Sequence, residues 1–212
     1  MPESTIDLQA EKETGRLEAF SDGVFAIAIT LLVLEIKIPH PATTTGVVPT
    51  SKALAIALAQ QWPSYFALIT SSFTILIMWV HHHTLFKLVH RTDARLLFAN
   101  GFLLLLVTVV PFPTAVVAEY LNTPAAPAAC VLYCGLFVLI AIAFWSLLMA
   151  ACRHPMRAPG ASDDVFVKIR KSYRFGPPIY LLATIAAPFN PWLSMGICTV
   201  SWVYWIATTA VL

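Results

Sequence analysis

The chain has 212 residues, of which 58% are hydrophobic and only 11% are charged, and its mean hydropathy is +0.77. Soluble proteins carry about 25% charged residues, so this composition indicates an integral membrane protein whose surroundings are a lipid bilayer. The net charge of +2 is too mild to predict a nucleic-acid partner, because Lys and Arg gather instead beside the apolar segments.

Residues 1–15 are polar and acidic, without the basic and then apolar pattern of a signal peptide, and we expect them to form a mobile cytoplasmic tail. After them, apolar stretches close to the length that crosses a bilayer predict an all-α protein with six transmembrane helices, which together form one domain over residues 16–212. The predicted spans are 20–38, 63–83, 95–118, 127–152, 175–187 and 191–212.

Two shorter helices are predicted outside these spans, one over residues 52–62 and a mixed polar one that starts near Val165. Prolines modify two of the spans. Pro111 and Pro113 should break or kink the far end of the third span, and Pro177 and Pro178 should disturb the start of the fifth.

The basic residues fix the expected orientation. Lys37 and Lys52 lie on one side of the predicted spans, and the other eleven Lys and Arg residues lie on the opposite side. Because basic residues accumulate in cytoplasmic loops, we expect a multi-pass protein of the cell membrane with both termini in the cytoplasm.

The four cysteines lie in or beside apolar runs and are interpreted as small hydrophobic residues rather than as a disulfide framework. Cys130 and Cys134 share a helical face, but a metal site there would need further ligands.

The first span carries a narrow apolar seam at alternating steps of four and three residues, formed by Phe20, Val24, Ile27, Leu31, Leu34 and Ile38. Ordinary helix packing explains such a seam. If the helix lined a symmetric pore, however, Ile27, Leu31 and Leu34 would form apolar rings that constrict the permeation path. Thr30 lies beside the seam, where its hydroxyl could contact an ion or bond back to a carbonyl one turn earlier.

The predicted topology brings separate polar residues to one depth near the cytoplasmic boundary. Ser21 and Asp22 begin the first span, His81 to His83 end the second, and Asn100 lies close to Arg95 in the third. Interhelical hydrogen bonding is the favoured role of these side chains, over direct ion coordination. Three consecutive helical residues point about 100° apart, so the three imidazoles cannot converge on one metal ion.

No sequence pattern predicts an enzyme or a cofactor. Ser21 lacks the G-x-S-x-G turn of a nucleophile, and the T-V-G-Y-G filter of conventional potassium channels is absent from the sequence.

Arg16, three further residues and then Phe20-Ser21-Asp22 at the start of the first span resemble the signature of the transmembrane protein 175 family of cation channels. The resemblance extends to Trp79, His82, Leu85 and Phe86, which match a W-x-x-H-x-x-L-F stretch, and to Asn100 as a polar partner.

The resemblance implies a homotetramer in which the first helices line a central pore that favours potassium over other monovalent cations. It implies that Ile27, Leu31 and Leu34 form the constriction and that Thr30 forms a selectivity layer. It also implies that a polar network holds the first helix in place, formed by Arg16, Phe20, Ser21, Asp22, Trp79, His82 and Asn100. Two alternatives remain: a proton-coupled secondary transporter that uses Asp22 and His82 as a relay, and a membrane-embedded enzyme.

Overall fold

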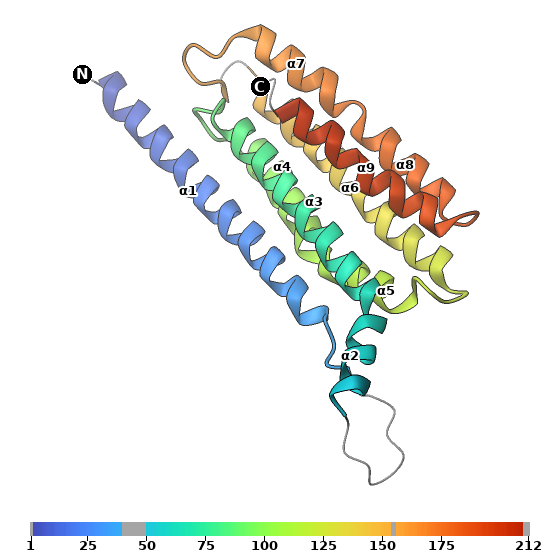
Figure 1. Ribbon diagram of the computed structural model, residues 1–212. Helices are drawn as coiled ribbons and strands as arrows, with labels where there is room; N and C mark the ends of the chain where they lie inside the picture. Colours follow the sequence, from blue (N-terminus) through green and yellow to red (C-terminus); the bar gives the residue numbers. More distant parts are fainter. Residues whose placement is uncertain (1, 40–49, 154–155, 210–212) are drawn as a thin grey trace.

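The computed structural model describes the backbone of residues 2–39, 50–153 and 156–209, and side chains from residue 13 onwards. Within these ranges it consists of helices without a named strand (Figure 1). The helices are α1 (Pro2–Leu31), η1 (Leu32–Glu35), α2 (Ser51–Gln60), α3 (Trp62–Phe86), α4 (Ala94–Val109), α5 (Pro111–Tyr120), α6 (Ala126–Ala151), α7 (Asp163–Tyr173), α8 (Gly176–Ala186) and α9 (Pro191–Thr209).

Four stretches of the described chain are long and apolar enough to cross a membrane, namely Glu13–Glu35, Trp62–Phe86, Ala94–Tyr120 and Ala126–Ala151. They agree with the first four predicted spans. The helices predicted for the last two spans are also present, as α8 with 11 residues and α9 with 19. The last three residues of the predicted sixth span lie outside the described part.

The N-terminal segment differs from the expected tail, because α1 begins at Pro2 and continues without a break into the first span. No proline or glycine interrupts residues 3–14, so the helix of the span can extend backwards over them. At its other end, α1 tightens into the 3-10 helix η1 after Leu31.

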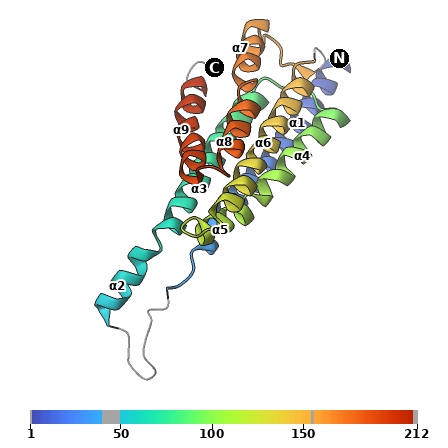
Figure 2. The same cartoon turned by 90° about the vertical axis from the view of Figure 1, so that its right-hand side faces the viewer.

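Prolines end or begin helices where the sequence predicts them to. The third span divides at Val110, after which Pro111 opens α5. Pro177 occupies the first turn of α8, where a missing backbone N–H costs nothing. Figures 1 and 2 show that α8 follows α7 along one line and that both lie beside α9.

The core includes the region where α6 packs between α4 and α8, with the buried residues Leu103, Phe137, Leu147 and Ala183. Gly176 allows a close approach at the start of α8. A Cβ atom there would lie 3.2 Å from both the Ala141 Cβ and the Trp205 ring. Small residues permit close helix packing in membranes. Because Gly176 has no side chain, α8 can pack closely against α6 and α9 at this position.

Both described ends of the chain lie at one end of the bundle, together with α7 and the connection between α3 and α4 (Figures 1 and 2). Asp93 caps α4 at this end, with its Oδ1 accepting from the Leu96 N–H at 2.9 Å and its Oδ2 paired with Arg153. At the opposite end, the Lys37 Nζ lies 2.6 Å from the Glu119 Oε2 and joins the end of the first span to α5.

Candidate functional site

One face of α1, continued by Leu32 of η1, is buried against the bundle. Ser21, Phe25, Ala28 and Leu32 follow each other at steps of four, three and four residues and are each at most 1% exposed. This spacing keeps all four side chains on a single face of the helix. That face packs against α3 and α4, beside which α1 runs in Figure 1.

A directional chain of hydrogen bonds joins α3, α4 and α1 at Ser21. The His82 Nε2 lies 2.8 Å from the Asn100 Oδ1, and the Asn100 Nδ2 donates to the Ser21 Oγ at 2.9 Å. The Ser21 hydroxyl in turn donates to the Leu17 carbonyl oxygen at 2.8 Å. Because Oδ1 can only accept, His82 is protonated on Nε2, and the chain ends on a backbone carbonyl.

Aromatic rings enclose the His82 imidazole. Phe25 from α1 lies 5.3 Å from it and Phe86 stacks on it at 4.3 Å, both measured between ring centroids. His82 and Asn100 are fully buried, and within the described part of the chain the His82 Nδ1 has no hydrogen-bond partner. A buried network of this kind permits only one register between the helices, because any shift leaves polar groups unpaired.

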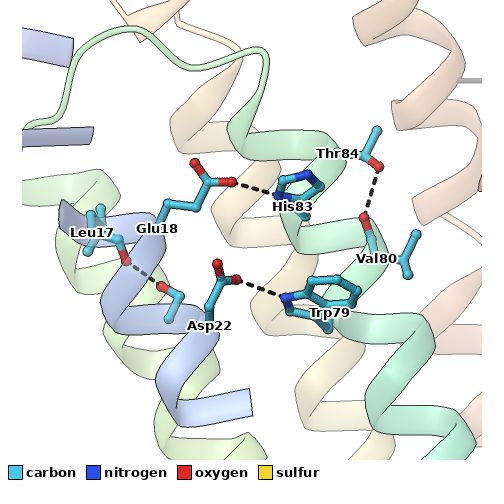
Figure 3. A network of polar contacts seen from close by, with 8 residues as sticks. Leu17, Glu18, Asp22, Trp79, Val80, His83 and Thr84 are labelled. Carbon is cyan, nitrogen blue, oxygen red and sulfur yellow. Dashed lines mark hydrogen bonds and ion pairs between the residues drawn. The ribbon is translucent and has the colours of Figure 1, made fainter. Parts of the chain in front are cut away.

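Two further contacts join α1 to α3 one turn apart (Figure 3). The Trp79 indole N–H donates to the Asp22 Oδ1 at 2.8 Å, and the His83 Nδ1 lies 2.7 Å from the Glu18 Oε1. The Trp79 and His83 rings stack with centroids 5.9 Å apart. The carboxylates of Glu18 and Asp22 are therefore both bound by aromatic N–H groups of α3.

The three consecutive histidines point to different neighbours, as helical spacing predicts. His82 bonds toward α1 and α4, and His83 bonds to Glu18. His81 turns to the other side of α3, where its Nε2 lies 3.1 Å from the Trp205 carbonyl oxygen and 3.0 Å from the Thr209 Oγ1. His82 is thus the imidazole that reaches Asn100.

Two residues expected in the polar network lie outside it. The Arg16 side chain is exposed and makes no hydrogen bond or ion pair with the residues that the structure describes. Phe20 is 64% exposed. Arg16 precedes Ser21 by five residues and Phe20 precedes it by one, which turns them about 140° and 100° away from the buried face.

The opposite face of α1 is apolar and exposed in the single chain. Ile27 is 58% exposed and Leu34 is 72% exposed, and Leu31 lies between them on the same face. Val24, which the seam also includes, is only half-buried and packs against the core. Between Ile27 and Leu31, the exposed Thr30 hydroxyl donates to the Ile27 carbonyl oxygen at 2.9 Å.

Sequence reasoning missed Glu18 and a second buried cluster. Glu18 precedes Asp22 by four residues, a spacing that places both acids on one helical face and could have identified the pair. The other cluster lies in the bundle interior, where the Ser71 Oγ is 2.7 Å from the Thr114 Oγ1 and 3.0 Å from the Tyr133 hydroxyl. Its members are distant in sequence, so only the fold brings them together.

Cys130, Cys134 and Cys198 lie in the core as expected, whereas Cys152 is half-buried. Cys130 and Cys134 of α6 face α9, where the Cys134 Sγ is 3.2 Å from the Cys198 Sγ and 3.2 Å from the Ser194 Oγ.

The first half of the chain, residues 16–111, matches the family described as endosomal/lysosomal potassium channel TMEM175. A potassium channel of Chamaesiphon minutus is 48% identical over 200 residues, which cover 94% of this chain and 96% of the relative. The chain belongs to the TMEM175 family. It is a multi-pass membrane protein, and the matched region contains the anchored first helix and the residues that bind it.

A crystal structure from the same organism, described as a lysosomal potassium-selective channel TMEM175 homolog, superimposes with a TM-score of 0.82 at 47% identity and covers 94% of this chain and 99% of that one. The zebrafish endosomal/lysosomal proton channel TMEM175 is 30% identical over 203 residues, which are 82% of this chain but 38% of the zebrafish protein. The TMEM175 fold is therefore the architecture of 94% of this chain.

Proposed function

We propose that this chain forms a potassium-permeable cation channel in which α1 lines the permeation path. The observation that carries the proposal is the uneven burial of the spans. Only 22% of the most apolar window of the first span is buried, against 50% for the third and the fourth. The least covered span is nevertheless held by interhelical hydrogen bonds through its back face.

Assembly of four copies gives the exposed face of α1 a role. Closed cyclic symmetry places the same face of each subunit around one axis, so a single seam becomes a set of rings. Ile27, Leu31 and Leu34 then form apolar rings, and such rings restrict ion passage by excluding water. The relatives that are named potassium channels support potassium as the permeant ion.

Thr30 supplies the only hydroxyl group of the first span on its exposed side. Since its proton is donated to the Ile27 carbonyl oxygen, its oxygen lone pairs remain free to accept. A ring of such oxygens can replace part of the hydration shell of a cation. In this proposal Thr30 therefore favours potassium, while the neighbouring apolar rings set the pore radius.

The buried network fixes the angle at which α1 meets the axis. The bonds of Ser21 and Asp22 hold the helix at its inner end, and the Lys37–Glu119 pair holds the outer end of the span. Six crossings, with α8 and α9 as the last two, place both termini on the cytoplasmic side, consistent with the bias of Lys and Arg.

The alternative of a proton-coupled transporter receives less support. Asp22 bonds to Trp79 and His82 bonds to Asn100, and no hydrogen bond links Asp22 to His82 among the described residues. An amide side chain does not titrate and the chain of donors ends at the Leu17 carbonyl, so this path cannot carry a proton onward.

Recordings from the full-length protein in planar bilayers test the proposal. With potassium on one side and sodium on the other, a channel gives unitary currents that grow with voltage and a reversal potential displaced toward potassium. Transport that saturates at low turnover and requires a pH gradient would instead support the transporter. The mass of the purified complex by native mass spectrometry tests for four copies.

A further inference from the structure

The C-terminal half of α7 carries an excess of positive charge. Lys168, Arg170 and Lys171 lie in its last two turns and Arg174 follows directly, whereas no acidic residue occurs after Asp164 in the sequence. The helix is amphipathic, with Phe166, Ile169 and Tyr173 buried beneath the charged face. Arg174 follows Arg170 by four residues and Lys171 by three, so each of these two cations is a neighbour of Arg174 on the helix surface.

These cations lack acidic partners within the described part of the chain. The neighbouring Arg153 and Arg157 pair with Asp93 and Asp163. By contrast, the side chains of Lys168, Lys171 and Arg174 make no ion pair with described residues, and the Arg174 guanidinium lies over the Phe175 ring at 4.8 Å. The charge around Arg174 is therefore available to an external anion.

A groove of about 200 Å³ opens beside Arg174 and is lined by Ile142, Trp145, Arg174 and Pro177. The guanidinium is thus the only charged group of an otherwise apolar lining. Further along α8, the exposed side chains are also apolar, namely Leu181, Leu182 and Ile185. The groove combines one cation with apolar lining residues, and exposed apolar side chains follow it along α8.

We propose that this groove binds an anionic phospholipid, with the phosphate at Arg174 and an acyl chain along α6 and α8. A soluble anion would gain nothing from the walls, and a zwitterionic lipid, which carries no net charge, would gain less from the cations than an anionic one. Basic pockets between spans on the cytoplasmic side recognise anionic head groups, and Trp side chains prefer the membrane interface. Figure 2 shows α7 above α8 at the end of the bundle where both termini lie.

The assignment rests on the proposed topology, which places α7 at the cytoplasmic leaflet, but it does not depend on conduction. Lipid binding to the detergent-solubilised full-length protein, measured by native mass spectrometry, tests it separately from the channel proposal. The probes are dioleoyl phosphatidylglycerol and dioleoyl phosphatidylcholine. We expect the first to bind about fivefold more tightly, which is the size expected for one basic residue near a membrane surface.

Variants locate the site. Arg174→Gln should remove the preference for phosphatidylglycerol, and Arg174→Lys should keep most of it. Lys87→Gln makes the same charge change at an exposed position at the end of α3, outside the groove, and should leave the preference unchanged. Ile142→Ser should weaken phosphatidylglycerol binding without changing charge. Helix content by circular dichroism verifies that each variant is folded.

Three results would overturn the proposal. Equal binding of the two lipids by the unmodified protein would show that it has no site selective for an anionic phospholipid. Equal losses in Arg174→Gln and Lys87→Gln would show diffuse attraction to the basic end of the protein. Displacement of the lipid by millimolar inorganic phosphate, without an effect of Ile142→Ser, would identify a site for soluble phosphate.

Discussion

The two faces of α1 have opposite environments although they belong to the same apolar segment. The back face holds Ser21, Phe25, Ala28 and Leu32, which are buried and bound to α3 and α4. The front face holds Ile27, Leu31 and Leu34, which remain between 40% and 72% exposed in the described subunit. Hydrophobicity alone does not separate the two sets, because both are mainly apolar.

The difference lies in the polar residues at the inner end. Within a bilayer, apolar surfaces gain little from contact with each other, whereas unpaired polar groups are costly. Ser21 and Asp22 therefore select which face of the helix turns toward α3 and α4. The apolar face opposite is then left exposed. From the difference between the two faces we expect substitutions on the back face to alter folding and substitutions on the front face to alter conduction.

The largest effect is expected for Asn100→Leu on the back-face network. It leaves His82 and Ser21 without their partner in a buried site, at a cost of about 2 to 3 kcal/mol in the free energy of unfolding. Unfolding in mixed detergent micelles measures this. Ser146→Ala is the matched control, because the Ser146 hydroxyl bonds only to its own helix at the Ile142 carbonyl oxygen. Equal stability of the two variants would contradict the anchoring role.

Ile27→Asn tests the front face. A polar side chain in an apolar ring admits water, so we expect a rise in basal conductance of about tenfold, which corresponds to a barrier lower by about 1.4 kcal/mol. Its stability should stay close to that of the unmodified protein. Ile206→Asn introduces the same group at an exposed position of α9 and should leave the current unchanged. An unaltered current in Ile27→Asn would remove Ile27 from the constriction.

Trp79→Phe keeps an aromatic ring but removes the indole N–H that binds Asp22. The carboxylate is only partly buried and can regain water, so the expected loss of stability is about 1 kcal/mol. Thermal unfolding in detergent gives the value. The accompanying change in α1 should also broaden the distribution of unitary currents, and a variant with unchanged stability would show that Asp22 does not depend on Trp79.

Thr30→Val retains the shape of the side chain and removes its oxygen. We expect the potassium-to-sodium permeability ratio to fall about twofold to threefold, because the neighbouring rings still control the radius. Thr30→Ser restores the hydroxyl and should restore the ratio. Reversal potentials under mixed ions provide the measurement, and identical ratios in all three proteins would exclude Thr30 from selectivity.

The smallest effect is expected away from both faces, at Asp93. Hydrogen bonding to the Leu96 N–H, and then to Arg153, lowers the pKa of this carboxyl group in the folded state. Its contribution to stability is therefore present above the unfolded pKa of about 3.9 and is lost as the pH falls through the lower folded value.

Asp93→Asn keeps a cap for α4 but removes the Arg153 pair, which should cost at most about 1 kcal/mol at pH 7. The difference from the unmodified protein should vanish in acid. A difference that persists in thermal unfolding at a pH below the folded pKa of Asp93 would show that the charge of Asp93 is not the cause.

The sequence by itself determined the spans and the breaks between them. Apart from α1, apolar length located the helices to within a few residues, and Pro111 and Pro177 marked helix starts because a proline is tolerated only in the first turn. It also indicated that Ser21, His82 and Asn100 lie at one depth, since topology fixes depth. The helix over residues 2–15 was missed, because polar composition describes solvation and not backbone conformation.

Only the tertiary structure decided which residues at one depth meet. Depth does not specify rotation about the helix axis, so the sequence could not assign His81, His82 and His83 to their three different partners. It likewise could not exclude Arg16 and Phe20 from the network or find Glu18 within it. Those assignments depend on the packing of α1, α3 and α4, where a rotation of about 100° exchanges one neighbouring side chain for the next.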